Sequence, residues 1–342
     1  MKFAPSTLQE WLRLPLRVGA ALMFLTIALV GLAWAMTWMP GESFRAAPPP
    51  LSAPQTGRRA RLEADLTALA GTIGERNLRV PEGLAAAADR IERAFIQAGW
   101  SVSSSPFTCR GQTVRNLIAD RPGTDPNADI VLLGAHYDSV ERSTGADDNA
   151  SGVAVLLEAA RALGQYSSVH PIRLVAFVNE EPPWFHTARM GSRVLAQQFA
   201  ARGDRLGQVL VMDAVGFFCD DDCQRYPPPF QWFFPKQGNF LAVVTRAADW
   251  LRLRDIVGLM RTTATLPTEG LAAPRWLPGI DYSDHAEFWN VGYPGILLTD
   301  APTYRNPNYH RMSDTPDTVD LERLTRTADA VIDVVRALAA RR

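Results

Sequence analysis

The chain has 342 residues, of which 47% are hydrophobic and 21% are charged, and its formal net charge at pH 7 is -1. A chain of this length and composition buries one large core or two modest ones, so it is typical of a globular protein. Because its lysines and arginines are not clustered, the composition argues against a nucleic-acid partner. No pattern in the sequence indicates an oligomeric state.

The N-terminal region differs from the rest of the chain. Residues 1–17 contain Lys2, Arg13 and Arg17, and residues 18–39 form an uncharged apolar run that is long enough to cross a membrane as a helix. Positive charges before such a run favour a cytoplasmic N-terminal end and export of the remainder. We therefore predict a transmembrane anchor with the folded domain outside the cytoplasm, in the periplasm or the extracellular space.

A cleaved signal peptide is the alternative interpretation of the same run. The residues Ala33 to Ala35 resemble a small-residue cleavage site, and cleavage there would give a secreted protein. The apolar run continues past this site to Met39, which favours the uncleaved anchor. Residues 40–57 are rich in Pro, Ala and Ser and predict an extended, weakly structured linker, so we expect the folded domain over residues 58–342.

Beyond the linker, the hydrophobic pattern alternates between helix and strand. Helical spacing is found at residues 59–73, 82–98, 151–163 and 191–201, and strand-like runs are found at residues 128–136, 172–179, 208–214, 240–244 and 295–300. This alternation predicts an α/β fold, a three-layer α/β/α domain around a central mixed, mostly parallel sheet. In such a sheet, ligands bind beyond the carboxyl ends of the strands.

Acidic residues and a histidine follow three of the predicted strands at their carboxyl ends. His136 ends one strand and Asp138 lies two positions further on. Glu180 and Glu181 follow the next strand, and Asp213 lies near the end of the third. A polar strand end is common by itself, whereas three in succession indicate a functional site.

Two further residues complete a set of ligands that suits a metal. Asp148 lies in GADDNASG, directly before a predicted helix, and His310 lies in NPNYHRMSDT. Imidazole nitrogens and carboxylate oxygens are the ligands that zinc binds in proteins. Carboxylates that converge in a crevice repel one another unless divalent cations neutralise them, so the set predicts a metal site.

Six motifs in order resemble the exported co-catalytic di-zinc aminopeptidase family. Its members include bacterial leucyl aminopeptidase and aminopeptidase Y, with glutamate carboxypeptidases and glutaminyl cyclases as more distant relatives. The motifs are GAHYDS, GADDNASGVAVLLEAARAL, FVNEE, MDAVG, DYSDHAEFWNVGYPGILLTD and YHRMSDTPDTVD, and the resemblance covers roughly residues 59–339. It implies a zinc-dependent metallopeptidase with peptide substrates, most simply an aminopeptidase that removes N-terminal residues.

The resemblance also implies a role for each metal-ligating position. Two zinc ions per chain are expected. His136 and Asp213 resemble the ligands of one zinc, and Glu181 and His310 resemble the ligands of the other. Asp148 resembles the carboxylate that bridges both ions.

Two further acids are expected to take part in catalysis. Glu180 resembles the family's general base, which takes a proton from the attacking water and passes it to the leaving amine. Asp138 resembles the carboxylate that orients the imidazole of His136. Asp147 matches no ligand position, so we expect it to be a loop or capping residue. Asp284 and His285 are expected to support the site without binding metal, while His170 and His186 match no ligand motif.

Other segments are candidates for contact with the substrate. Tyr304 and Arg305 precede His310, where either would reach a substrate carbonyl or carboxylate. Residues 225–240 are rich in aromatic side chains, which either wall a pocket or cap the domain. Cys219 and Cys223 form either a local disulfide bond or two free thiols, and Cys109 is left without a partner in both cases.

Two other functions are compatible with the same fold. One is a glutaminyl-cyclase-like acyl-transfer enzyme with a single zinc, and the other is a non-catalytic binding domain. The complete set of two-metal ligands favours the peptidase, and the number of metal ions per chain distinguishes the three.

Overall fold

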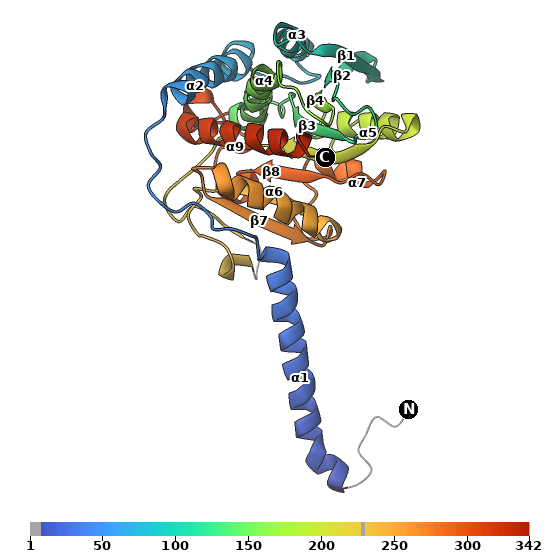
Figure 1. Ribbon diagram of the computed structural model, residues 1–342, viewed down its shortest axis with the longest axis vertical. Helices are drawn as coiled ribbons and strands as arrows, with labels where there is room; N and C mark the ends of the chain where they lie inside the picture. Colours follow the sequence, from blue (N-terminus) through green and yellow to red (C-terminus); the bar gives the residue numbers. More distant parts are fainter. Residues whose placement is uncertain (1–7, 227–229, 342) are drawn as a thin grey trace. The chain divides into compact units, whose positions relative to one another are not determined.

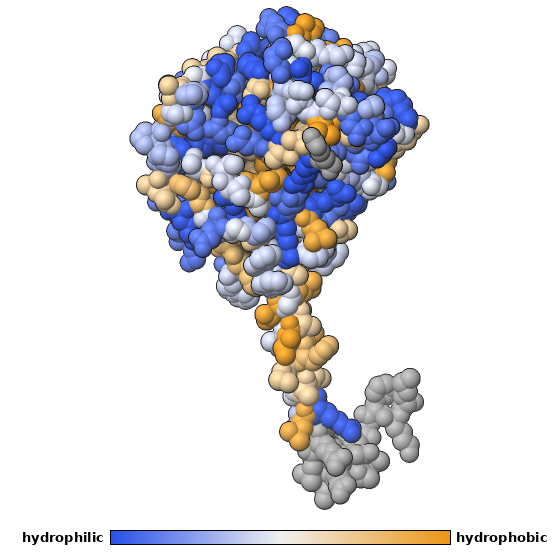
Figure 2. All heavy atoms as spheres, in the orientation of Figure 1, coloured by the Kyte–Doolittle hydropathy of each residue, from blue (hydrophilic) through white to orange (hydrophobic). Residues whose placement is uncertain are grey.

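The computed structural model describes residues 8–226 and 230–341, which separate into two compact units after Trp38. The first unit contains α1 (Leu8–Thr37). Its segment Pro15–Thr37 has a mean hydropathy of 2.2 and is long and apolar enough to cross a membrane. Figure 2 shows apolar side chains along this helix. The segment overlaps the predicted run of residues 18–39, and its length and composition suit a membrane anchor or a signal sequence.

The second unit is an eight-stranded sheet with helices packed on both faces (Figure 1). The strands are β1 (Ser101–Cys109), β2 (Gln112–Arg121), β3 (Ile130–His136), β4 (Ile172–Phe177), β5 (Leu206–Met212), β6 (Leu241–Arg246), β7 (Thr268–Ala273) and β8 (Ile296–Thr299). The helices are α2 (Ala53–Leu66), α3 (Pro81–Gln97), α4 (Gly152–Leu163), α5 (Gly191–Arg202), α6 (Trp250–Thr263), α7 (His285–Trp289), α8 (Pro302–Arg305) and α9 (Leu321–Ala339).

The sheet is mixed, with a parallel centre. Its strand order is β1-β2-β4-β3-β5-β8-β6-β7. Strands β4, β3, β5 and β8 are parallel to one another, and β2 and β6 pair with this group in the antiparallel direction. The parallel centre places the carboxyl ends of β3, β4 and β5 at one edge of the sheet.

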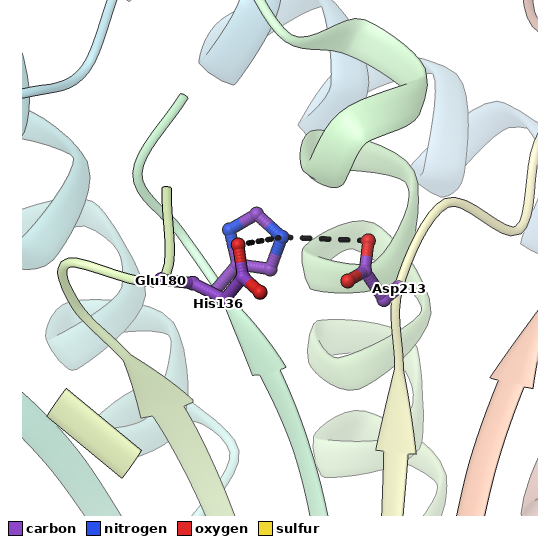
Figure 3. A group of neighbouring side chains, drawn as sticks. All are labelled: His136, Glu180 and Asp213. Carbon is purple, nitrogen blue, oxygen red and sulfur yellow. Dashed lines mark hydrogen bonds and ion pairs between the residues drawn. The ribbon is translucent and has the colours of Figure 1, made fainter. Parts of the chain in front are cut away.

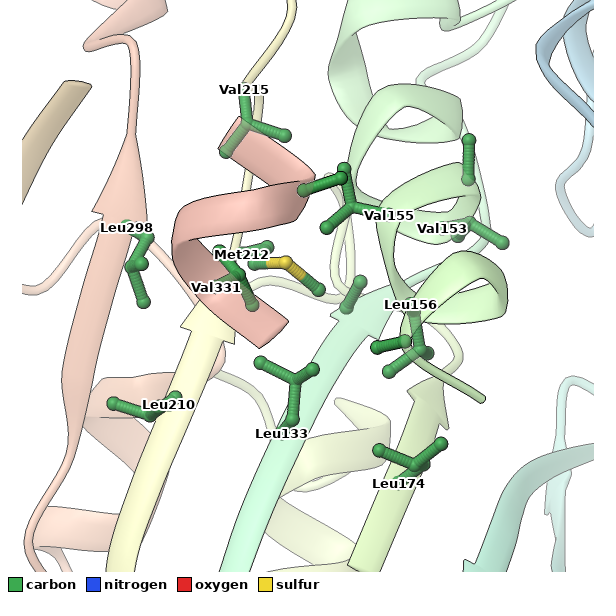
Figure 4. Close-up of a cluster of buried hydrophobic side chains, with 14 of the residues drawn as sticks. Leu133, Val153, Val155, Leu156, Leu174, Leu210, Met212, Val215, Leu298 and Val331 are labelled. Carbon is green, nitrogen blue, oxygen red and sulfur yellow. The ribbon is translucent and has the colours of Figure 1, made fainter. Parts of the chain in front are cut away.

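Alternating side chains of the central strands form two separate cores. Leu133, Leu174, Leu210 and Leu298 point to one face, where they belong to the same core as Val155 of α4 and Val331 of α9 (Figure 4). Their neighbours Leu132, Val175, Val209 and Leu297 point to the other face, into the core that contains Phe199 of α5 and Phe288 of α7. Successive side chains of a strand point to opposite faces, so strands buried on both faces read as continuous apolar runs. The predicted three-layer α/β/α fold is confirmed.

Several elements of the structure have no counterpart among the predicted helices and strands. They are β1, β2, β7, α6, α7, α8 and α9. Strand β1 has the sequence SVSSSPFTC and is mostly exposed, because it is the edge strand that pairs only with β2 among the described strands. An exposed edge strand needs few apolar residues, so its sequence pattern is weak.

The segment predicted as a weakly structured linker is ordered against the folded domain. Helix α2 already begins at Ala53, where Ser52 and Gln55 form a capping box. Ser43 exchanges hydrogen bonds with the main chain of Thr268 in β7, with its hydroxyl 3.0 Å from the nitrogen and 3.1 Å from the oxygen. Further hydrogen bonds to this segment come from Arg261 and Arg326, which donate to main-chain oxygens between Met39 and Pro49. The segment covers the edge strand β7, a partner that its own composition does not reveal.

Candidate metal centre

The predicted acids and histidines meet at the carboxyl edge of the parallel strands. His136 is the last residue of β3, Asp213 directly follows β5, and Glu180 and Glu181 lie in the loop after β4. These strands are neighbours in the sheet, in the order β4-β3-β5. All four side chains are almost completely buried.

The first group of side chains able to hold a metal ion contains His136, Glu180 and Asp213 (Figure 3). The Nε2 atom of His136 lies 3.4 Å from Oδ1 of Asp213 and 3.9 Å from Oε2 of Glu180. The same nitrogen lies 3.2 Å from Oδ1 of Asp148. The imidazole therefore faces three carboxylates from three different segments.

The second such group contains Asp148, Glu181 and His310. The Nε2 atom of His310 lies 3.1 Å from Oε2 of Glu181 and 3.2 Å from Oδ2 of Asp148. The two oxygens of Asp148 thus face different histidines, with Oδ1 toward His136 and Oδ2 toward His310. Asp148 connects the two groups.

Asp138 and Asp314 hold the main chain of these ligand candidates. The Asp138 carboxylate lies 3.5 Å from Nδ1 of His136 and accepts hydrogen bonds from the main-chain nitrogens of Glu180, at 3.2 Å, and Glu181, at 3.1 Å. The carboxylate of Asp314 accepts hydrogen bonds from the main-chain nitrogens of Asp147, at 2.8 Å, and Asp148, at 3.1 Å. Asp314 was not singled out from the sequence, although it lies in the motif that contains His310.

The donor set fits a divalent cation. Burial, together with the charge of Asp148, raises the pKa of Glu181 to about 8, and burial raises the pKa of Glu180 well above its ordinary value. Hydrogen bonds with Asp148 and Glu181 outweigh burial and raise the pKa of His310 to about 10. Among the described residues, the recorded partner of the buried Oε2 atom of Glu181 is the Nε2 atom of His310, at 3.1 Å. Crowded carboxylates with raised pKa values favour a cationic partner, and nitrogen and oxygen ligands suit zinc.

Three residues at the site have main-chain conformations that are rare outside glycine. Asn179, Ala214 and His310 have φ angles of 59°, 49° and 57°. Asn179 precedes Glu180, and Ala214 follows Asp213. Left-handed conformations of non-glycine residues store strain and cluster at functional sites, where the surrounding structure holds them in place.

The family follows from comparison with known proteins. Residues 116–335 match the sequence model of peptidase family M28. The chain belongs to this family. It is 33% identical over 295 residues to the uncharacterized protein YfbL of Escherichia coli, covering 82% of this chain and 90% of that protein. It is also 48% identical over 229 residues to aminopeptidase YwaD of Bacillus subtilis, covering 66% of this chain and 44% of that protein.

A solved structure supports the fold of this M28 peptidase. The zinc aminopeptidase BSAP of Bacillus subtilis aligns with a TM-score of 0.64 at 17% identity, over 83% of this chain and 95% of that chain. Membership in family M28 makes the protein a metallo-exopeptidase, and its two clusters of acids and histidines are the metal-binding candidates of the enzyme.

An apolar cavity of about 120 Å³ adjoins the first metal group of the M28 peptidase. Asp213 and Tyr309 belong to its lining, together with the aromatic side chains of Tyr226, Phe230, Phe234, Phe240 and Tyr304. The aromatic segment 225–240, in the part that the structure describes, therefore walls a pocket. The ring of Tyr309 stacks on His310 at 3.9 Å, and burial and the nearby carboxylates raise the pKa of its phenol, which keeps the hydroxyl a hydrogen-bond donor.

Arg305 and Asp147 form hydrogen bonds with residues outside the two metal groups. Arg305 is not positioned for substrate: it is buried, and it donates to Oε1 of Gln224 at 2.7 Å and to the main-chain oxygen of Phe240 at 2.8 Å. Asp147 accepts a hydrogen bond from the main-chain nitrogen of Gly216 at 2.9 Å and one from the side chain of Asn306 at 2.7 Å. Both residues support the loops around the site.

The remaining histidines are bonded outside the two metal groups. His285 lies 2.8 Å from the main-chain oxygen of Ile280, and the adjacent Asp284 is buried, which raises its pKa to about 8. His170 lies 2.7 Å from the main-chain oxygen of Asp129, and the ring of His186 lies 2.8 Å from a carboxylate oxygen of Glu287. Cys219 and Cys223 form a disulfide bond, while Cys109 is buried as a free thiol.

Proposed function

We propose that this M28 peptidase is an aminopeptidase that binds two zinc ions per chain and releases single residues from the N-termini of peptides. The observation that carries the proposal is the position of Asp148, whose two oxygens lie 3.2 Å from two different imidazole nitrogens. A carboxylate in this position is suited to bridge two cations.

The distances support a specific set of ligands. Zinc binds nitrogen and oxygen at about 2.0–2.2 Å, so two ligand atoms of one tetrahedral ion lie about 3.4 Å apart. From Nε2 of His136, the oxygens of Asp148 and Asp213 are 3.2 and 3.4 Å away, whereas that of Glu180 is 3.9 Å away. We assign His136, Asp148 and Asp213 to one zinc, with Glu180 outside its ligand set.

The second zinc is assigned to Asp148, Glu181 and His310. The nitrogen of His310 lies 3.2 Å from Asp148 and 3.1 Å from Glu181, which matches the spacing expected for ligands of one ion. Two ions held in this way would activate a water molecule as a nucleophile and polarise the substrate carbonyl.

Glu180 is the proposed general base. Its main-chain nitrogen donates a hydrogen bond to Asp138, and its carboxylate lies at the edge of the first metal group. Among the described residues, no Lys or Arg side chain forms an ion pair with this carboxylate. Burial raises its pKa, which brings its proton affinity toward that needed for catalysis near neutral pH. It accepts the proton of the attacking water and donates it to the leaving amine.

Asp138 and Tyr309 complete the proposed chemistry. Asp138 orients His136 and, through two main-chain hydrogen bonds, fixes both Glu180 and Glu181. The phenol of Tyr309 lines the cavity beside Asp213, where it donates a hydrogen bond to the substrate oxygen as negative charge develops.

The cavity suggests which residues are removed. An apolar cavity of about 150 Å³ binds benzene, so we assign this apolar cavity of about 120 Å³ to a side chain no larger than a leucine or a single aromatic ring. The α-amine of a peptide has a pKa of about 8 and is largely protonated at neutral pH, so the surrounding carboxylates favour a free N-terminus over a blocked one.

Metal analysis combined with a paired substrate screen tests the proposal. We expect two zinc ions per chain, hydrolysis of leucyl- and phenylalanyl-anilides, and no hydrolysis of the N-acetylated forms. One zinc with cyclisation of N-terminal glutamine would instead support the acyl-transfer function. Absence of bound metal and of turnover would support the binding domain, and cleavage of N-acetylated peptides would contradict the aminopeptidase assignment.

We further propose that α1 is an uncleaved membrane anchor and that the catalytic domain, the compact unit that begins at Met39, lies outside the cytoplasm. The apolar segment Pro15–Thr37 and the positive residues before it support this orientation. The disulfide bond between Cys219 and Cys223 suits an oxidising compartment.

A further inference from the structure

Arg76 is a completely buried arginine beneath the metal centre. It lies between α2 and α3, has 0% of its surface exposed, and makes five hydrogen bonds through its guanidinium group to main-chain oxygens. A buried charge is costly unless it is well hydrogen-bonded. The hydrogen bonds of Arg76 therefore offset the cost of burying its guanidinium group, and their partners indicate what the residue does.

The hydrogen bonds of Arg76 join two of the three segments that carry the proposed ligands of the first zinc, those of His136 and Asp148. Its Nε atom donates to the oxygen of Tyr137 at 2.9 Å, and Tyr137 lies between His136 and Asp138. Its Nη1 atom donates to the oxygen of Thr144 at 2.6 Å, and its Nη2 atom donates to that of Gly145 at 2.9 Å. Thr144 and Gly145 open the turn that contains Asp148.

The main chain of Arg76 reinforces the same connection. Its nitrogen donates to Oγ of Ser139 at 3.0 Å, and its oxygen accepts a hydrogen bond from the nitrogen of Ser139 at 2.9 Å. The remaining two guanidinium bonds go to the oxygens of Leu69, at 3.2 Å, and Gly74, at 2.7 Å, in the segment that precedes Arg76. Arg76 is therefore anchored to its own segment by two hydrogen bonds and bonded by three others to the segments that contain His136 and Asp148.

Gly145 provides the space for this contact. Its φ angle is +54°, which favours glycine, and a Cβ atom there would lie 2.3 Å from the main-chain oxygen of Asp148 and 3.1 Å from Nη2 of Arg76. The glycine that opens GADDNASG thus permits the close packing of the Asp148 turn over the guanidinium group.

The charge of Arg76 acts on the same site. Burial lowers the pKa of its guanidinium group to about 10, and the carboxylates of Asp138, Asp314, Asp148 and Glu181 oppose that decrease. The group is therefore positively charged at neutral pH. Its recorded hydrogen bonds go to carbonyl oxygens, so no carboxylate forms a direct ion pair with it among the described residues, and its field extends to the acidic cluster.

We propose that Arg76 is a positioning residue of the metal centre, which sets the separation of His136 and Asp148 and offsets part of the negative charge of the ligands. The inference rests on the ligand assignment of the proposed function. Groups that orient metal ligands typically contribute 10- to 100-fold to metal affinity.

Arg326 provides a matched control because it is also a buried arginine. It is 1% exposed, and it bonds to Glu322 at 2.7 Å and to Oγ1 of Thr265 at 2.7 Å, with no recorded contact to a ligand of either zinc. Replacing it removes a buried guanidinium group without touching the ligand-bearing segments. Any effect on zinc that both arginines share is then an effect of general destabilisation.

The experiment measures zinc affinity by chelator competition, and thermal stability before zinc is added, for the full chain and the variants Arg76→Met, Arg76→Lys and Arg326→Met. We expect Arg76→Met to weaken zinc binding by about 10- to 100-fold. Arg76→Lys keeps the charge but loses most of the carbonyl contacts, so it should fall between Arg76→Met and the wild type. Arg326→Met should lower stability but leave zinc affinity within about twofold of the wild type.

Two results would overturn the inference. One is wild-type zinc affinity in a folded Arg76→Met protein, or in Arg76→Lys if the methionine variant does not fold. The other is an equal loss of affinity in Arg326→Met. If the wild-type chain itself binds no zinc, the proposed function fails, and that outcome is distinct from both.

Discussion

The adjacent residues Glu180 and Glu181 allow the two proposed acidic roles to be separated by one type of substitution. Glu180→Gln preserves the size of the side chain, and the main-chain hydrogen bond to Asp138, at 3.2 Å, is unaffected. The amide cannot accept the proton of the attacking water. We therefore expect this variant to bind two zinc ions and to lose most of its peptidase activity.

The expected loss of rate in Glu180→Gln follows from the role of Glu180 as a general base. A positioned general base contributes typically about 10²- to 10⁴-fold to a rate. Since each tenfold change corresponds to about 1.36 kcal/mol, the loss of Glu180 should raise the activation barrier by about 3 to 5 kcal/mol. The reduction should appear in kcat, because the ground-state contacts of the substrate with the cavity remain.

Glu181→Gln should have the opposite signature. In the wild type, Oε1 of Glu181 accepts a hydrogen bond from the main-chain nitrogen of Val140 at 2.9 Å, while Oε2 faces His310 at 3.1 Å. An amide must keep its oxygen toward the Val140 nitrogen, which turns its NH₂ group toward the metal position. This group cannot bind zinc, so we expect the variant to retain only one zinc.

The assay is zinc content per chain, together with kcat and KM on leucyl-anilide, for the wild type and both variants. Loss of zinc from Glu180→Gln would show that Glu180 is a metal ligand, as its place in the first metal group also permits. Turnover at the wild-type rate in that variant would refute the general-base assignment. Two firmly bound zinc ions in Glu181→Gln would refute the ligand assignment.

Three further predictions concern the cavity, pH and the N-terminus. Ala242→Leu, which fills the cavity, should lower kcat/KM for leucyl and phenylalanyl substrates by about tenfold or more and leave alanyl substrates little changed, and a uniform loss would contradict it. Burial opposes ionisation of Glu158, but Arg61 and two further arginines outweigh it and lower its pKa below the ordinary 4.5. In urea unfolding, the wild type should therefore have a higher free energy of unfolding than Glu158→Gln above pH 4.5, and this difference should disappear as the pH falls further. A difference that does not change with pH would show that it does not come from the ionised Glu158 carboxylate. The mature protein should keep residues 1–35 and sediment with membranes, whereas N-terminal sequencing that begins at Met36 would show a cleaved signal peptide.

The central sheet was predictable because its information is local. Strands β3, β4 and β5 are buried on both faces, so each appears as a continuous apolar run, and the polar residues that end these runs are visible beside them. Parallel strands bring their carboxyl ends to one edge, which is why His136, Glu180 and Asp213 were expected to meet. The apolar segment near the N-terminus was equally visible, because a membrane-length helix is defined by a contiguous stretch.

The supports of the site were not predictable in the same way. Asp314 holds the main chain of Asp148 across 166 positions of sequence, and Arg76 reaches Gly145 across 69. Neither contact has a periodic pattern, since each depends on how separate loops pack. Arg305 was expected within reach of the substrate, yet it is buried and bonded to Gln224 and to the main-chain oxygen of Phe240.

The sequence by itself determined which chemical groups form the metal site and which strand carries each of them. Both could be recognised because an apolar run and the polar residues that end it are adjacent in the sequence. Only the tertiary structure decided the distances between those groups. The position of Asp148 between two imidazoles depends on hydrogen bonds from Asp314 in a distant loop. The apolar cavity beside Asp213 depends on the packing of side chains from separate segments, and the ordered course of residues 39–49 depends on hydrogen bonds with β7 and with distant arginines. Long-range contacts of this kind become defined only when the chain has folded around them.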